Sequence, residues 1–114
     1  MRYMLTFYAI EDEWMALPAA EREAGIREIG MWFADQSRAG KIVEGRRLGR
    51  GTKTVRLGRV RKKDLPMVTD GPFMEAKETV GSYAIVDVAG EDEAIAFAKT
   101  WPAGGVVEVR QVAE

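Results

Sequence analysis

The chain has 114 residues, 46% of them hydrophobic and 31% charged, with a net charge of −1, which is the size and balance of one globular domain. It contains neither cysteine nor histidine, and this excludes disulfides, thiolate or histidine metal ligands, and the Ser-His-Asp and Cys-His catalytic groups. No apolar run reaches the roughly 20 residues of a membrane span, so we expect a single domain over residues 1–114 in the cytoplasm.

The first third of the chain predicts a strand followed by a long helix. Residues 2–10 carry apolar side chains at both parities, which favours a strand covered on both faces. Pro18 suits the first position of a helix, and we expect that helix to run over residues 18–39. Apolar residues at the spacing of one helix face support it: Ile26, Ile29 and Phe33. Gly40 is the expected left-handed cap.

A basic, glycine-punctuated segment follows the helix. Residues 42–48 predict a short strand, and residues 53–60 and 65–69 predict a hairpin. Between Lys41 and Lys63 there are ten basic residues against one acid, a net charge of +9 that leaves −10 on the rest of the chain. Such a segment is either an electrostatic footprint for an anionic partner or a solvated hairpin whose charges keep its edges from pairing; we favour the second reading.

The run Val68-Thr69-Asp70-Gly71-Pro72-Phe73 marks a corner between the hairpin and the next strand. Gly71 allows unusual backbone angles, Pro72 fixes its own φ near −65°, and Phe73 supplies an apolar anchor. Asp70 is placed at this corner, where aspartate is an ordinary turn former.

The last third repeats the strand–helix–strand order. Residues 74–78 read as a polar connection with one turn of helix, and residues 80–88 as a second strand that is apolar on both faces. The acids at Glu91, Asp92 and Glu93 announce a helix, with a stripe at Ala94, Phe97 and Trp101. Pro102 ends that helix, and residues 106–112 predict the last strand.

This order predicts an α+β, ferredoxin-like βαββαβ fold with an inserted β-hairpin. Two helices cover only one face of a four-stranded sheet, yet two strands are apolar on both faces. We expect the apolar groups at Met4, Tyr8, Ala84 and Val86 to lie on the face without helices. A homodimer packed sheet to sheet would cover that face.

The run from Leu65 to Glu78, with Asp-Gly-Pro-Phe at its centre, resembles the DGPF branch of the YCII-related family. The resemblance continues through Gly81–Val88, Trp101-Pro102 and Val107–Arg110, and includes Met1–Leu5, so it covers nearly the whole chain. It implies a dimeric α+β barrel, in agreement with the sheet-to-sheet homodimer.

Two departures limit what the resemblance implies. Family members often carry serine before the proline that opens the first helix, where this chain has Leu17, so a capping bond is expected to be missing. The broader family is also associated with a His-Asp pair suggested to be catalytic, and this chain has no histidine to supply it.

The first functional hypothesis is a small-molecule site in a cleft between sheet and hairpin. Asp70 would be its general base if buried, and Arg46 or Arg47 could hold an anionic substrate. The expected ligand-binding residues are Tyr3, Arg46, Thr69, Gly71, Pro72, Phe73 and Tyr83. A cofactor-independent enzyme fits this set by analogy of fold alone. The alternative roles are turn capping for Asp70 and core packing for the tyrosines.

The second hypothesis is a non-catalytic regulatory or interaction module. Proteins that resemble this family occur beside extracytoplasmic-function sigma factors, which implies a link to sigma-factor-dependent transcription. Residues 41–63 contain no aromatic side chain for base stacking, which argues against specific recognition of nucleic acid. We expect no metal site, because Glu91-Asp92-Glu93 is better explained as a charged helix start.

Overall fold

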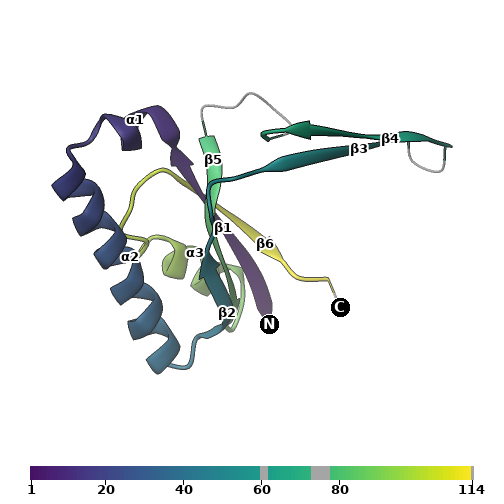
Figure 1. Ribbon diagram of the computed structural model, residues 1–114. Coiled ribbons are helices and arrows are strands. Elements are labelled where there is room, and N and C mark those ends of the chain that lie inside the picture. The colour runs from purple at the N-terminus through teal and green to yellow at the C-terminus, as the bar shows by residue number, and fades with distance from the viewer. Residues whose placement is uncertain (60–61, 73–77, 114) are drawn as a thin grey trace.

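The computed structural model describes residues 1–59, 62–72 and 78–113 and shows an α+β arrangement (Figure 1). In chain order the elements are β1 (Arg2–Ile10), α1 (Glu11–Ala16), α2 (Ala19–Arg38), β2 (Ile42–Arg47), β3 (Lys53–Arg59), β4 (Lys62–Asp70), β5 (Glu78–Asp87), α3 (Glu91–Ala98) and β6 (Val106–Gln111). None of the helices in these ranges is long and apolar enough to cross a membrane.

The main sheet has four antiparallel strands in the order β2-β5-β1-β6. Helices α2 and α3 both lie against one face of it, and among the described residues no helix lies on the opposite face (Figure 1). This antiparallel sheet with helices on one side is compatible with the ferredoxin-like fold expected from the order of the elements.

The core lies between the sheet and the two long helices and is rich in aromatic rings. The Phe7 ring is almost fully buried and stacks on Trp101 with ring centroids 3.8 Å apart. Trp32 meets the Phe7 and Phe97 rings edge-on and donates its Nε1–H to Thr100 Oγ1 at 2.9 Å. Helix α2 is thereby tied to α3 and to the central strand.

The register of β1 on β5 decides which residues the helices cover. Leu5 pairs with Ala84 and Tyr3 with Val86, and all four side chains are buried on the helix-covered face. The expectation that Ala84 and Val86 lie on the uncovered face was therefore wrong. The apolar residues of β5 on that face are at the other parity.

The first helical region differs from its prediction. Glu11–Ala16 forms a separate helix with three acids in its first turn, where no helix was expected. Pro18 is the N-cap of α2 and no side chain caps it, consistent with the serine missing before the proline. Gly40 has a φ of +74° and follows α2 as predicted.

Within the part of the chain that the structure describes, strands β3 and β4 pair only with each other, as a separate two-stranded sheet. We call residues 53–59 and 62–70 the arm. It leaves the body at the end of β2 and projects on the side of the main sheet opposite the helices (Figure 1). The helical turn was expected at residues 74–78; residues 73–77 lie outside the described residues, and Glu78 begins β5.

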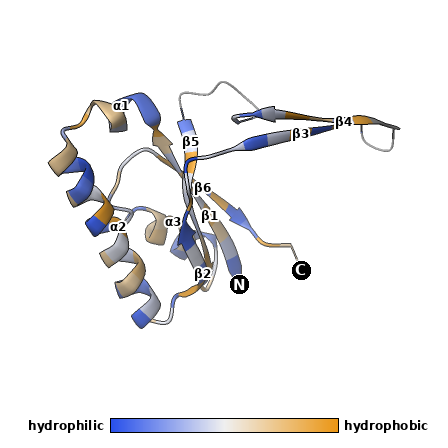
Figure 2. Ribbon diagram, in the orientation of Figure 1, coloured by the Kyte–Doolittle hydropathy of each residue, from blue (hydrophilic) through white to orange (hydrophobic). Residues whose placement is uncertain are grey.

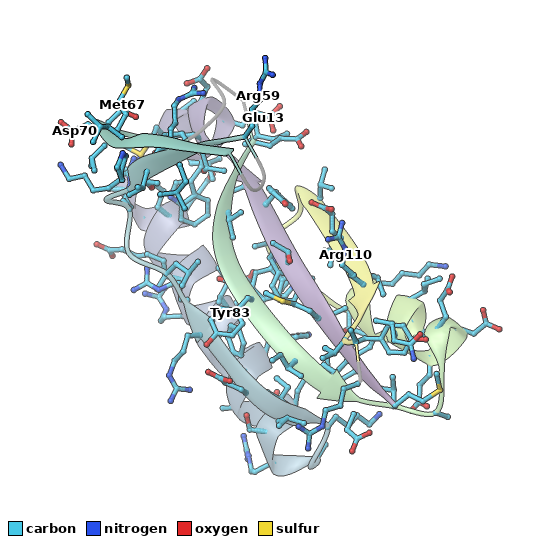
Figure 3. The ribbon with its side chains drawn as sticks, turned by 90° about the vertical axis from the view of Figure 1, so that its right-hand side faces the viewer. Glu13, Arg59, Met67, Asp70, Tyr83 and Arg110 are labelled. Atoms are coloured by element: carbon cyan, nitrogen blue, oxygen red, sulfur yellow. The ribbon has the colours of Figure 1, made fainter. Side chains whose placement is uncertain are left out.

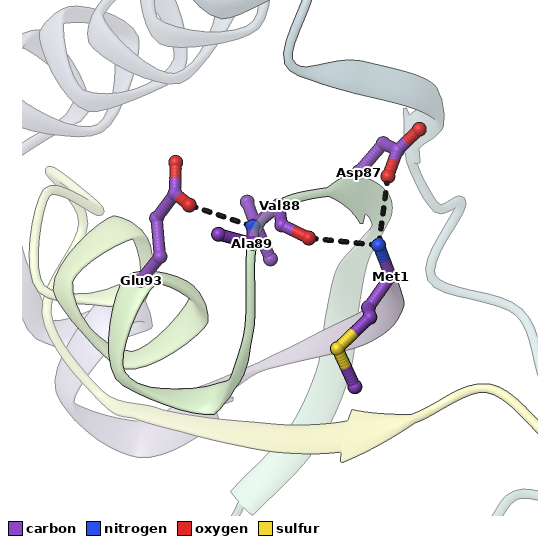
Figure 4. Close-up of polar contacts among 5 residues, drawn as sticks. All are labelled: Met1, Asp87, Val88, Ala89 and Glu93. Carbon is purple, nitrogen blue, oxygen red and sulfur yellow. Dashed lines mark hydrogen bonds and ion pairs between the residues drawn. The ribbon is translucent and has the colours of Figure 1, made fainter.

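The opposite end of the sheet is closed by backbone and terminal groups (Figure 4). The Met1 amine donates to the Val88 carbonyl at 2.8 Å and to Asp87 Oδ1 at 3.2 Å. The Ala89 N–H donates to Glu93 Oε2 at 2.7 Å, so a side chain from the first turn of α3 fixes the loop that precedes that helix. This end of the sheet therefore carries the Asp87 carboxylate and the Met1 amine as an ion pair, next to the loop that Glu93 fixes.

Candidate functional site

The face of the main sheet without helices is the first candidate surface. We call it the open face, and Figure 3 looks onto it, with Tyr83 on β5 and Arg110 on β6. The register of the four strands places these side chains on it: Met4, Thr6, Tyr8, Glu44, Arg46, Tyr83, Ile85, Glu108 and Arg110. Its middle is apolar or aromatic and half-exposed, and its two edges are charged and exposed.

One polar cluster on the open face joins β5 to β2. The Tyr83 hydroxyl donates to Glu44 Oε1 at 2.7 Å, and this hydrogen bond is the main reason that the pKa of Tyr83 is raised above 10.0, with Arg46 acting weakly in the opposite direction. The Arg46 Nη1 donates to the Gly45 carbonyl at 2.8 Å. The phenol therefore stays protonated at neutral pH.

A second cluster of the same composition joins β1 to β6. A hydrogen bond with Glu108 is the main reason that the pKa of Tyr8 is raised, and Arg110 lowers it slightly. Each outer strand thus supplies one glutamate and one arginine, two residues apart, to a tyrosine on the neighbouring inner strand. The two halves of the open face present the same chemistry.

The predicted corner at Asp70 lies at the base of the arm. The Asp70 side chain is 84% exposed and forms an ion pair with Lys53, its partner across the two strands. Gly71 has a φ of +90° and donates its N–H to the Thr52 carbonyl at 2.7 Å, while its own carbonyl accepts from Thr54 Oγ1 at 2.6 Å. These contacts close the arm at its base.

The arm exposes apolar side chains to an unusual degree. Leu65 is 92% exposed and Val68 is 62% exposed, and three further apolar residues are more than half exposed: Val55, Leu57 and Met67. Figure 2 shows hydrophobic residues along β4 beside hydrophilic ones on β3. A two-stranded ribbon in water is marginally stable by itself, and exposed apolar groups at this density are typical of a contact surface.

The structure does not bring the predicted ligand-binding residues together. Tyr3 is buried in the core under the helices, whereas Tyr83 and Arg46 are cross-strand partners on the open face. Thr69 pairs with Thr54 on the arm and Pro72 is exposed just beyond it. Phe73 lies outside the described residues.

Sequence reasoning missed Glu44, Glu108 and Arg110 as members of the site. Their signal is the alternation of Val106–Gln111, in which Glu108 and Arg110 share one parity while Val107 and Val109 pack on the core. Glu44 gave no comparable signal, because a register shift between Ile42 and Glu44 changes the parity of β2.

The hollows that the described residues form are shallow and lie near the two chain ends. A surface hollow of about 440 Å³ is lined by Met1, Gln111, Val112 and Ala113, at the end of the sheet away from the arm. Among the same residues, no group of three or more carboxylates lies close enough to hold a metal ion.

The sheet, the helices on one face and the strand order define a small α+β protein that is compatible with the ferredoxin-like fold. The model of the YCII-related domain matches residues 1–114, so the chain belongs to the YCII-related family. A search of curated proteins finds no match to this chain.

Proposed function

We propose that this protein binds a small molecule on the open face, over the middle strands of the sheet. The observation that supports it is the Tyr83 hydroxyl held by Glu44 at 2.7 Å on a face that no helix covers. Ligand sites are mostly apolar with a few oriented polar groups. Met4 and Ile85 supply the apolar surface, and the Tyr8 and Tyr83 hydroxyls supply the oriented polar groups.

The chemistry of the clusters indicates the class of ligand. Because the phenol gives its hydrogen to a carboxylate, its oxygen is left to accept a hydrogen bond from the ligand. Arg46 and Glu44 lie together at the edge of the face and balance each other in charge. These features favour a neutral molecule with an apolar body and a hydroxyl or amide donor, instead of the anionic substrate that Arg46 alone suggested.

We propose binding, not catalysis, as the primary role. A carboxylate general base needs burial or a shifted proton affinity to work near neutral pH, whereas Asp70 is highly exposed and paired with Lys53. Its contacts are those of a residue that closes the base of the arm. The hypothesis of a cofactor-independent enzyme centred on Asp70 draws no support from this geometry.

The test is a titration of the isotope-labelled protein with benzyl alcohol, in which the NMR chemical shifts of the backbone amides report binding. Saturable shifts on β1 and β5 are expected, with weaker binding of the charged analogues benzoate and benzylamine. Tyr83→Phe should weaken benzyl alcohol binding severalfold, because it removes one hydrogen bond. Tyr3→Phe, which removes a phenol oxygen on the helix-covered face, is the control. Shifts that do not saturate, or that map away from the open face, would refute the proposal.

A second candidate function is an interaction module that uses the arm. The exposed Leu65 and Val68 side chains, in a segment rich in basic residues, favour it. The partner class that the family resemblance implies is an extracytoplasmic-function sigma factor. Binding of a purified sigma factor of this type should be lost in Leu65→Ser/Val68→Ser and kept in Met31→Ser, an exposed residue of α2. Equal binding by all three proteins would exclude the arm as the contact.

A further inference from the structure

The two tyrosine clusters of the open face are oriented toward opposite edges of the sheet. Tyr83 lies on the inner strand β5 and donates its hydroxyl hydrogen to Glu44 on the outer strand β2 at 2.7 Å. Tyr8 lies on the other inner strand, β1, and its hydroxyl is hydrogen-bonded to Glu108 on the other outer strand, β6. Each phenol therefore directs its hydrogen toward the nearer edge of the sheet and away from the middle.

This orientation leaves both phenol oxygens with an acceptor site on the same area. A hydroxyl that donates its hydrogen can still accept a hydrogen bond through its lone pairs. Because the carboxylates lie toward the edges, the free side of each oxygen faces the middle of the open face or the solvent above it. A molecule that lies between the two phenols therefore meets an acceptor at each end.

The area between the two phenols is uncharged. It is formed by Met4 and Thr6 on β1 and by Ile85 on β5, and all three side chains are partly exposed. The arginines of the open face, Arg46 and Arg110, lie on the outer strands. An apolar chain can therefore cross from one phenol to the other without covering a charge, and covering a charge is costly.

We propose that one ligand molecule spans the open face and donates a hydrogen bond at each end, one to the Tyr83 oxygen and one to the Tyr8 oxygen. This binding mode rests on the function proposed above and narrows its ligand class. The ligand is a neutral molecule with an apolar chain between two terminal donors, each a hydroxyl or an amide N–H. Tyr8 is then a second ligand-binding residue, with the same role as Tyr83.

The strand register sets the length of such a ligand. Tyr83 pairs with Thr6, two residues before Tyr8, so the Cα atoms of the two tyrosines are about 8 Å apart. The glutamates that hold the phenols, Glu44 and Glu108, are three strands and one residue pair apart, or about 16 Å. The phenol oxygens lie between these limits. Two hydrogen bonds of about 2.8 Å then leave roughly 3–10 Å between the donor atoms of the ligand.

The competing arrangement is two separate small molecules, one on each phenol. A molecule that binds by one end gains nothing from a donor at its other end, and that polar group makes the burial of its chain less favourable. A diol would then bind more weakly than the alcohol of the same chain length. In the spanning mode the second hydrogen bond reverses this order, because one such bond strengthens binding about fivefold.

The test compares 1,4-butanediol, 1,6-hexanediol and 1,8-octanediol with 1-butanol, 1-hexanol and 1-octanol, using amide chemical shifts of the whole chain to obtain each Kd. At the chain length that fits best, the diol should bind at least about fivefold more tightly than its alcohol. This advantage should be smaller at the other lengths. Hexanedioate and 1,6-diaminohexane should bind more weakly than 1,6-hexanediol, because each cluster already pairs a glutamate with an arginine of opposite charge.

Substitutions separate the two ends of the ligand. Tyr8→Phe and Tyr83→Phe should each abolish the advantage of the diol. Tyr8→Phe should change the Kd of the matched alcohol no more than about twofold, because the Tyr83 oxygen is still present. Thr6→Val, which removes the hydroxyl between the two phenols at nearly constant volume, is the control and should keep the advantage. Circular dichroism shows whether each variant is folded.

The outcomes distinguish the spanning ligand from the function on which it rests. Saturable benzyl alcohol shifts on the open face with no advantage for any diol would overturn the spanning mode and leave the proposed function in place. No saturable shift with any compound would overturn both. Two diols bound per chain, an advantage that survives Tyr8→Phe, one that is lost in folded Thr6→Val, or tighter binding of 1,6-diaminohexane would each overturn the inference as stated.

Discussion

Trp101→Ala should destabilise the protein strongly, although the Trp101 side chain is only partly buried. The Trp101 ring lies beyond the end of α3 and stacks on Phe7 with a centroid distance of 3.8 Å and an interplanar angle of 19°. It also meets the Trp32 and Phe33 rings edge-on. Truncation therefore opens one side of the central strand's largest buried residue.

The magnitude follows from the area that is uncovered. A half-buried indole removes roughly 130 Å² of apolar surface from water, which at about 25 cal/mol per Å² is about 3 kcal/mol. The lost ring stacking adds about 0.5–1.5 kcal/mol. Solvent can enter part of the space left behind, so the cavity term is small, and we expect a loss of about 3.5–4.5 kcal/mol for Trp101→Ala.

Urea unfolding followed by far-ultraviolet circular dichroism measures this loss as a shift of the midpoint at unchanged slope. Trp101→Phe retains the stack and should cost less than half as much. Met31→Ala, a truncation of a residue that is 64% exposed on α2, is the control and should cost under about 0.5 kcal/mol. A loss below about 1 kcal/mol for Trp101→Ala would show that the stack on Phe7 contributes little to the core.

Three further predictions concern single contacts. Gly105→Ala should destabilise by several kcal/mol, because its Cβ would lie 2.1 Å from a carbonyl oxygen of β1 at a φ of +81°, whereas Gly104→Ala, which meets no atom within 4 Å, should cost only about 1 kcal/mol in the same urea assay. The pKa of Tyr83 is raised in the folded state, so any stability linked to it is present below pH 10 and is lost as the pH rises through the folded pKa. Glu44→Gln should move that titration to lower pH in the ultraviolet absorbance of tyrosinate, and an unmoved titration would contradict the hydrogen bond. Asp70→Asn breaks an exposed ion pair and should lower stability by no more than about 1 kcal/mol; a larger loss would mean that the corner supports the body and not only the arm.

The order of the elements could be predicted because apolar residues recur at helical spacing in the helices and fill both sides of the two central strands. Of the expected α2 stripe, Ile29 and Phe33 pack on the core but Ile26 is 37% exposed. The acids in the first turn of α3 and the two strongly apolar strands at 2–10 and 80–88 are local signals that tertiary structure did not override. Glu11–Ala16 was missed although the same local rule applies to it, since its three leading acids favour the positive end of a helix dipole. They were read as a break in the strand instead.

The covered face of β5 could not be predicted because both of its parities are apolar. Ala84 and Val86 are the smaller set, and Tyr83 and Ile85 the larger, yet the smaller set faces the helices. The pairing with β1 decides the face: Tyr3 and Leu5 face the helices, and their cross-strand partners Val86 and Ala84 share that face. The local pattern of β5 does not say which of its two apolar sides pairs in this way.

The members of the open face could be predicted only in part for a related reason. Tyr83 and Arg46 were chosen for their side-chain chemistry, and the register makes them neighbours. Tyr83 and Glu44 are 39 residues apart, so their hydrogen bond depends on how β2 aligns with β5. Asp70 was chosen because Asp-Gly-Pro-Phe is a rare local sequence. Such a sequence indicates a turn of the backbone, and by itself it does not indicate a catalytic group.

The way the arm is joined to the body has a consequence for hydrogen exchange. Among the residues that the structure describes, its two strands pair only with each other, so the hydrogen bonds between β3 and β4 can open and close while the body stays folded. In the protein without a bound partner, the amides of β3 and β4 should exchange with solvent at a rate set by the opening of this two-stranded ribbon. The amides of β1 should exchange only when the whole domain unfolds. Any partner that lies against the arm must then slow the exchange of its amides, and the protected residues would trace the footprint of that partner along β3 and β4.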